Sequence, residues 1–126
     1  AEQWMMYCKN KHFGGSFEEK ILKESNPKEI KKYGRLVENF DEKEWLAVSS
    51  LYVFRGNYAK FTQNKKLKDY IMQFSYGTIF VEASPYDMIW GVGLEEKDPL
   101  IIDEKNWKGY NLLGRVLTEV RTVLET

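Results

Sequence analysis

The sequence has 126 residues, of which 43% are hydrophobic and 15% aromatic, so it can bury the core of one domain, 1–126, and we expect no second domain. Nineteen basic and nineteen acidic side chains give a formal charge of zero, which excludes a bulk positive field that would attract nucleic acid from a distance. No run approaches the roughly 18 apolar residues of a membrane span. No signal-peptide pattern opens the sequence, and its single cysteine cannot form an internal disulfide, so we expect a cytoplasmic protein without membrane contact.

Helical spacing of apolar side chains predicts six helices in chain order. Ser16 and Asp41 each precede a glutamate by three positions, which is the spacing of a capping box, and Asn26-Pro27 suits a helix start. Gly34 is expected to end the third helix and to free Arg35 as a planar donor that points into a cleft. The expected helices cover approximately residues 2–11, 16–25, 27–34, 41–59, 65–74 and 111–124.

Two short segments have the composition of strands. Thr78–Ala83 is rich in β-branched and aromatic residues, and Leu100–Ile102 is a second, weaker candidate inside a charged loop. The fold class predicted from these elements is mostly α, of the α+β type: a single compact helical domain with a few short strands.

The stretch 82–93, Glu-Ala-Ser-Pro-Tyr-Asp-Met-Ile-Trp-Gly-Val-Gly, directly follows the first expected strand. An apolar run that ends in carboxylates, a hydroxyl and an indole brings reactive groups to one place, as many sites require. The alternative is a polar loop in which Trp90 fills the core.

Six groups of residues occur in a characteristic order along essentially the whole chain. The groups are Glu2 with Lys9; Gly34-Arg35; Phe40-Asp41 with Trp45; Lys60-Phe61-x-x-Asn64; Glu82-x-Ser84-x-x-Asp87-x-x-Trp90-Gly91-x-Gly93; and Trp107-x-Gly109-x-Asn111-x-Leu113-Gly114-x-x-Leu117-x-x-x-Arg121. In this order they resemble the NADAR domain family. The resemblance implies an N-glycosidase that acts on early riboflavin-biosynthesis intermediates, or a relative that removes ADP-ribose from guanine. Family members usually carry a few dozen residues before the position of Glu2, so we expect this sequence to lack the family's N-terminal segment.

Carboxylates and lysines are the acid–base groups available for catalysis. With one histidine and one cysteine the sequence has no metal-ligand spacing and no Ser-His-Asp triad, and we expect neither a metal nor a cofactor. Glycosidic cleavage uses an acid to protonate the leaving group and a carboxylate to stabilise the anomeric carbon, and Glu2 and Asp87 are the candidates, with Glu82 third. The alternatives are a helix N-terminal acid for Glu2 and a turn-capping side chain for Asp87.

Lys9 offers a second route to cleavage. An amine kept neutral by burial could form a Schiff base with an opened ribosylamine, with Glu2 as proton shuttle; the alternative is a lysine whose stem covers the core. Cys8 lies in the same apolar helical stretch and is expected to be a buried small hydrophobe rather than a nucleophile.

Substrate binding is assigned to aromatic walls and polar ligands. Trp45, Trp90 and Trp107 could stack on a heteroaromatic base, and Arg35 could hold a phosphate. Ser84 and Asn111 could hydrogen-bond ribose hydroxyls. We therefore expect Glu2, Lys9, Arg35, Trp45, Asp87 and Trp90 to surround one pocket.

Three classes of function remain. The first is a hydrolase that cleaves an N-glycosidic bond to a phosphorylated or ADP-linked ribose, with a nucleotide or ribosylamine phosphate as substrate or, alternatively, ADP-ribosylated nucleic acid. The second is a non-catalytic module that binds ADP-ribose or a related nucleotide, although binding alone does not need three proton-transfer groups. The third is a helical interaction domain, which would leave the polar stretches 82–93 and 107–121 unexplained.

Overall fold

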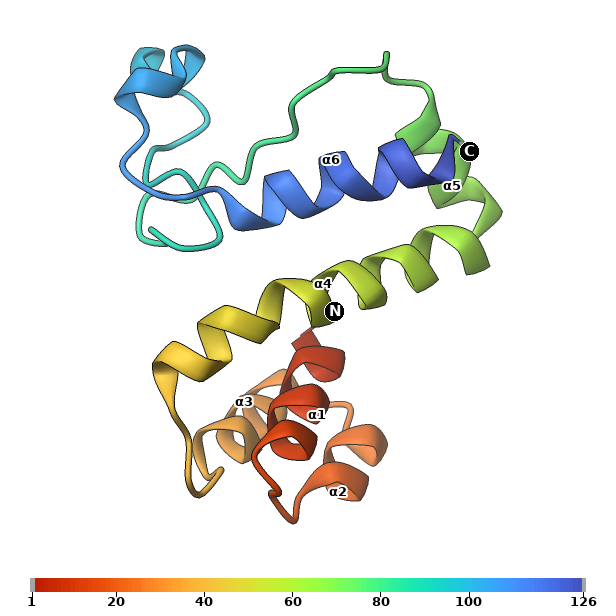
Figure 1. Cartoon of the computed structure of the whole chain (residues 1–126), viewed down its shortest axis with the longest axis vertical. Helices are drawn as coiled ribbons and strands as arrows, with labels where there is room; N and C mark the ends of the chain where they lie inside the picture. Colours follow the sequence, from red (N-terminus) through yellow and green to blue (C-terminus); the bar gives the residue numbers. More distant parts are fainter. Residues whose placement is uncertain (1, 126) are drawn as a thin grey trace. The chain divides into compact units, whose positions relative to one another are not determined.

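The computed structural model describes residues 2–125 and consists of helices joined by irregular segments (Figure 1). The chain divides into two compact units, the first ending at Gly56 and the second beginning at Asn57. Among the described residues, none of the helices is both long enough and apolar enough to cross a membrane. The helices are α1 Glu2–His12, α2 Glu18–Lys23, α3 Pro27–Arg35, α4 Glu42–Gln63, α5 Lys65–Met72, the 3₁₀ helices η1 Pro99–Ile102 and η2 Glu104–Asn106, and α6 Leu112–Leu124.

In the first unit, α1 packs against both α2 and α3. The side-chain amide of Gln3 donates to the carbonyl oxygens of Ile21 at 2.7 Å and Glu24 at 2.9 Å, which satisfies carbonyls at the C-terminal end of α2. Cys8, Ile21 and Ile30 are buried where these helices meet. α1 is therefore the helix on which both α2 and α3 pack.

The helix starts of the first unit follow the capping signals in two of three cases. The Asn26 side chain accepts from the Lys28 amide at 3.0 Å, and the Asp41 carboxylate accepts from the Glu44 amide at 3.1 Å. Ser16 does not cap its helix, because α2 begins two residues later without a side-chain cap. Phe17 occupies the N-cap position of α2, and its ring stacks on Tyr33 of α3 with 5.2 Å between the ring centres.

Gly34 lies inside α3 rather than at its end. The helix continues through Arg35 and is capped at Leu36. A Cβ on Gly34 would overlap the sulfur of Met6, so the close approach of α1 and α3 favours glycine here, and no turn of the chain is involved.

In the second unit the expected strands are absent, which corrects the α+β assignment: between residues 2 and 125 no strand is formed, and the fold is all-helical. Thr78–Ala83 does not form a strand because side chains of α6 and its N-cap take the place of a partner strand. The Phe80 amide donates to the Thr118 hydroxyl at 3.3 Å, and the Glu82 amide donates to the Asn111 side chain at 2.9 Å. Figure 1 shows this segment running along α6 without a neighbouring strand.

The second expected strand, Leu100–Ile102, is part of the 3₁₀ helix η1. Asp98 accepts from the Leu100 amide at 3.0 Å, and Pro99 occupies the first helical position, where its missing N–H costs nothing. Asp98 and Pro99 therefore start a turn of 3₁₀ helix in a segment whose apolar composition is also typical of strands.

The C-terminal end of α6 is tied to the end of α5 by a buried arginine. Arg121 is 5% exposed and donates to the Phe74 carbonyl from Nε at 2.9 Å and from Nη2 at 2.7 Å, while Nη1 lies 3.0 Å from a carboxylate oxygen of Glu125. A guanidinium can make this forked contact, and an ammonium cannot.

Candidate functional site

Lys9 is a partly buried amine in the first unit. Its Nζ lies 4.3 Å from the centre of the Phe40 ring. Burial lowers the pKa of Lys9 below the ordinary value of 10.5, because the ammonium form loses hydration. The ring face favours the ammonium form, so the aromatic contact and burial act in opposite directions on the pKa of this amine.

Phe40 belongs to an aromatic cluster that joins Lys9 to Trp45. The ring centres of Phe13 and Phe40 are 5.3 Å apart, and those of Phe13 and Trp45 are 6.2 Å apart. The remaining two rings are His12, whose centre lies 6.5 Å from Trp45, and Tyr52, which stacks on Trp45 at 5.9 Å. Two of the predicted site residues, an amine and a ring wall, therefore share one environment in the first unit.

Glu2 and Arg35 lie at the exposed ends of their helices. A carboxylate oxygen of Glu2 is 3.9 Å from the Lys31 ammonium, and both side chains are about half exposed, so the ion pair contributes little to stability. Glu2 occupies the first turn of α1, where the helix dipole favours a negative charge. Arg35 is exposed in the last turn of α3.

Cys8 is buried and unreactive, as the sequence indicated. Its side chain is 3% exposed, and burial raises the pKa of its thiol to about 11. A thiol with that pKa is almost entirely protonated at neutral pH, which excludes it as a nucleophile there.

The stretch 82–93 in the second unit is a loop held against the start of α6. Helices leave their first N–H groups without intrahelical partners, and here backbone carbonyls of the loop accept them. The Asn111 amide donates to the Gly91 carbonyl at 3.0 Å, and the Leu113 amide donates to the Trp90 carbonyl at 3.1 Å. This pairing explains why 82–93 and 107–114 occur together in the sequence pattern: each satisfies the backbone of the other.

Three predicted site residues lie in this loop. One carboxylate oxygen of Asp87 accepts from the amides of Ile89 at 3.0 Å and Trp90 at 2.8 Å, so Asp87 caps the turn. Its second carboxylate oxygen makes no hydrogen bond within residues 2–125. Ser84 and Trp90 are half-buried in the same loop.

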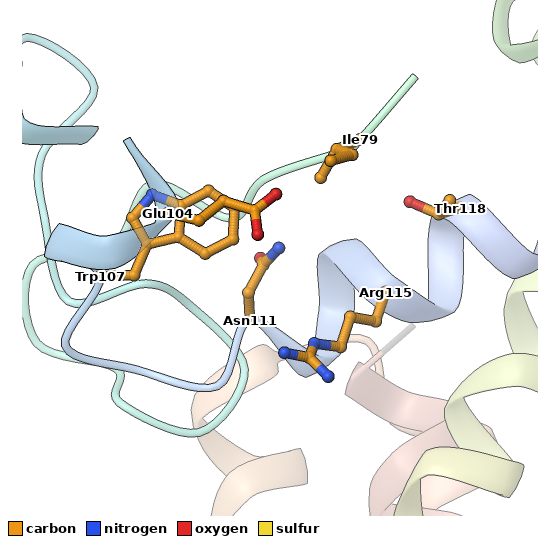
Figure 2. Close-up of a pocket in the computed structure, with 6 residues that line it drawn as sticks. All are labelled: Ile79, Glu104, Trp107, Asn111, Arg115 and Thr118. Atoms are coloured by element: carbon orange, nitrogen blue, oxygen red, sulfur yellow. The ribbon is translucent and has the colours of Figure 1, made fainter. Parts of the chain in front are cut away.

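Trp107 and Asn111 line an open pocket of about 270 Å³ in the second unit (Figure 2). The Trp107 indole N–H donates to the Ile101 carbonyl at 2.8 Å, which fixes the ring as a wall. In Figure 2, Trp107 and Glu104 lie at one end of the pocket, and Ile79 lies at the other end near Thr118.

Asn111 is 1% exposed and has the left-handed backbone angle φ 53°. Its amide nitrogen donates to the Phe80 carbonyl at 3.0 Å, and its amide oxygen accepts from the Glu82 amide at 2.9 Å. Both bonds hold the segment from Phe80 to Glu82 against the N-terminal end of α6.

Two charged residues that line this pocket, Glu104 and Arg115, were not predicted from the sequence. Arg115 and Glu104 are exposed, and neither side chain has an ion pair or hydrogen bond within the described residues. Arg115 could have been found, because Asn111, Arg115 and Thr118 are spaced by four and three residues and so share one face of a helix. Glu104 carries no such signal.

Within the two units, the predicted residues form three groups, and Glu2 and Arg35 are exposed at the ends of their helices. Lys9 and Trp45 share the aromatic cluster of the first unit. Trp107 and Asn111 share the pocket of the second unit. Asp87, Trp90 and Ser84 lie in the loop bonded to the start of α6.

Comparison with known protein families matches residues 1–125 to the NADAR domain. A protein of Acanthamoeba polyphaga mimivirus named N-glycosidase R617 is 43% identical over 122 residues, which cover 96% of this chain and 71% of that protein.

In two further relatives the match covers a smaller share of the relative's own length. Protein irg-1 of Caenorhabditis elegans is 40% identical over 129 residues, and the chain spans 60% of its length. The chloroplastic riboflavin biosynthesis protein PYRR of Arabidopsis thaliana is 31% identical over 112 residues, which are 82% of this chain and 16% of that protein.

Proposed function

Since this chain belongs to the NADAR domain family, we propose that it is a hydrolase that cleaves the N-glycosidic bond between a phosphorylated or ADP-linked ribose and an amino-heteroaromatic base. In this reaction the bond between the anomeric carbon and the base nitrogen breaks, water supplies a hydroxyl to the carbon, and a proton goes to the nitrogen. The observation that carries the proposal is the 43% identity to a relative named an N-glycosidase, over 96% of the chain.

Lys9 is the proposed nucleophile of a Schiff-base route. Its lowered pKa increases the fraction of neutral amine available to attack the opened sugar. The Lys9 nitrogen would form a bond to the anomeric carbon as the base amine leaves, and water would then release the sugar and restore the amine. The Phe40 ring, 4.3 Å from Nζ, holds the side chain in place.

Glu2 and Asp87 are the proposed acid–base groups. Glu2 is free to exchange protons with water because its carboxylate is about half exposed. Asp87 uses one oxygen to hold its turn and keeps the other available. In a direct route without Lys9, these two carboxylates would protonate the leaving base and stabilise positive charge at the anomeric carbon.

Substrate binding is proposed for the remaining predicted residues. The indoles of Trp45, Trp90 and Trp107 would stack on the base, a contact worth about 1–3 kcal/mol for each ring. The exposed guanidinium of Arg35 would hold phosphate. The polar groups of Ser84 and Asn111 would contact ribose hydroxyls.

The test incubates the protein separately with a phosphorylated ribosylamine of the riboflavin route and with ADP-ribosylated guanine, and resolves the products by mass. The Lys9→Arg variant should lose activity together with the secondary amine that borohydride traps during turnover, because a guanidinium stays protonated. Glu2→Gln should bind substrate while the rate falls by about 10²- to 10⁴-fold. Lys11→Arg is the matched control, because Lys11 is an exposed lysine on the same helix and should retain full activity.

Each other outcome leads to a definite revision. Full activity in Lys9→Arg would favour direct attack by water with Glu2 and Asp87 as the acid–base pair. Binding of ADP-ribose by the wild-type protein without release of base from either substrate would replace the hydrolase by a nucleotide-binding module.

A further inference from the structure

His12 is the only histidine of the chain, and its two ring nitrogens connect side chains from two parts of α4. Nε2 lies 2.9 Å from a carboxylate oxygen of Glu44, and Nδ1 lies 3.2 Å from the Tyr52 hydroxyl. The His12 ring also meets the edge of Phe13 at 4.8 Å between centres. The imidazole is 19% exposed, so it is packed into the aromatic cluster rather than free in solvent.

The partners of His12 determine the direction of both hydrogen bonds. An ionised carboxylate can only accept, so the proton of a neutral imidazole lies on Nε2 and is donated to Glu44. Nδ1 is then the acceptor, and the Tyr52 hydroxyl donates to it. Tyr52 is thereby held at its hydroxyl by His12, and its own backbone carbonyl accepts from the Trp4 indole at 2.8 Å.

The Tyr52 ring fixes the position of Trp45. The two rings are stacked with 5.9 Å between their centres and 26° between their planes. They lie seven residues apart on α4, two helical turns, so their side chains project from the same face. Anything that holds the phenol of Tyr52 therefore holds one face of the Trp45 indole.

We propose that His12 is a positioning residue, which fixes the Trp45 ring through Tyr52 so that its indole is ready to receive the heteroaromatic base of the substrate. The proposal rests on the substrate-binding role proposed above for Trp45. Stacking needs a flat ring at a fixed angle, and a preorganised ring avoids the cost of ordering it when the ligand binds. Glu44 supports the arrangement by keeping the Nε2–H tautomer of His12.

The first test needs no enzyme activity. Protein labelled with 5-fluorotryptophan gives one fluorine resonance for each of its four tryptophans, and Trp45→Phe identifies the resonance of Trp45. Tyr52→Phe keeps the stacked ring and removes only the hydroxyl, and we expect it to move or broaden the Trp45 resonance. His12→Gln, which keeps a donor near Glu44 and loses the acceptor near Tyr52, should do the same.

Tyr33→Phe is the matched control. Tyr33 is another stacked tyrosine of the first unit, 5.2 Å from Phe17, and its hydroxyl has no hydrogen-bond partner within residues 2–125. Its replacement should leave the Trp45 resonance unchanged. An unchanged Trp45 resonance in both Tyr52→Phe and His12→Gln, or an equal shift in Tyr33→Phe, would overturn the proposal.

The second test measures turnover of the better substrate of the two. Tyr52→Phe and His12→Gln each remove the hydrogen bond between His12 and Tyr52 that positions the Trp45 ring. Loss of this one bond should raise KM by about 2- to 10-fold. The same variants should change kcat by less than about 2-fold, because the positioned ring binds the base and transfers no proton. His12→Asn, which keeps an acceptor for Tyr52, should lie closer to the wild type.

The two proposals fail in different ways. A wild-type protein that cleaves neither substrate contradicts the hydrolase, whatever the fluorine spectra show. An active protein in which Tyr52→Phe moves the Trp45 resonance but leaves KM unchanged contradicts the positioning role of His12 and leaves the hydrolase standing.

Discussion

Replacing Asn111 by alanine should destabilise the second unit by about 3 kcal/mol. The substitution removes the hydrogen bonds to the Phe80 carbonyl and the Glu82 amide. A backbone group left unpaired costs about 1–3 kcal/mol when buried, and Phe80 and Glu82 are half-buried, so the lower value of about 1 kcal/mol applies to each. Alanine at φ 53° adds about 1 kcal/mol of backbone strain.

A comparison of two variants separates the contributions. Asn111→Gly loses the same two hydrogen bonds but tolerates the positive φ, so it should be about 1 kcal/mol less destabilising than Asn111→Ala. Urea unfolding followed by circular dichroism measures both free energies. Hydrogen exchange at the Glu82 amide should also accelerate in both variants, because its acceptor is gone.

The reasoning would be refuted if Asn111→Ala unfolds within 0.5 kcal/mol of the wild type, a change that is typical of surface substitutions without a structural role. Equal free energies for the alanine and glycine variants would refute the strain contribution alone. Unchanged exchange at Glu82 would show that the amide does not depend on Asn111.

Three further predictions concern buried polar and titratable groups. Burial lowers the pKa of Lys9 in the folded protein below the ordinary value of 10.5, so the unfolded chain binds more protons between the folded and the unfolded pKa. The charged lysine therefore lowers the stability at neutral pH, and stability should rise toward pH 10 as the amine loses its proton. Lys9→Met should raise the melting temperature at pH 7 and flatten this rise. Cys8, with a pKa of about 11, should react with iodoacetamide at pH 7 only as fast as the protein unfolds, as mass spectrometry with and without urea can measure, and rapid labelling of the folded protein would contradict its burial. Arg121→Lys should cost about 1–3 kcal/mol in urea unfolding, because one ammonium cannot replace both donors to the Phe74 carbonyl; a change below 0.5 kcal/mol would contradict the fork.

The helices could be predicted from sequence because their signals are local. Apolar side chains at helical spacing located α1, α4, α5 and α6, and the Asn26-Pro27 start signal located α3. The side chains of Asn26 and Asp41 cap the helices that follow them, as expected. α4 continues to Gln63, four residues beyond its predicted end at Ala59, because nothing in the sequence between these residues breaks a helix.

The strands could not be predicted because a strand requires a partner, and a partner is not a local property. The β-branched composition of Thr78–Ala83 indicates a segment that avoids helix, yet its backbone groups are satisfied by Asn111 and Thr118, more than 25 residues later in the chain. The composition of a segment indicates the backbone conformation that it prefers. The tertiary structure determines which groups form hydrogen bonds with its backbone.

The shared environment of Lys9 and Trp45 depended on information that the sequence only partly contains. Phe13 directly follows α1, and its amide donates to the Lys9 carbonyl at 3.2 Å, so the sequence places this ring one helical turn after the lysine. The contact of Phe13 with Trp45 on α4 and the contacts of His12 with Glu44 and Tyr52 require the packing of α1 against α4. A lone histidine therefore looked uninformative in the sequence.

The residues that match the family differ in whether folding alone explains them. Asn111 and Arg121 bond the backbone of other segments, Asp87 caps its own turn, and a Cβ on Gly109 would meet atoms of Met88 at 2.8 Å. Their substitution should therefore lower stability along with activity, and loss of activity would not identify a catalytic role. Glu2 is half exposed in a weak ion pair, and burial disfavours the charged form of Lys9. Substitutions of Lys9 that leave the protein folded are therefore the decisive test of its proposed chemistry.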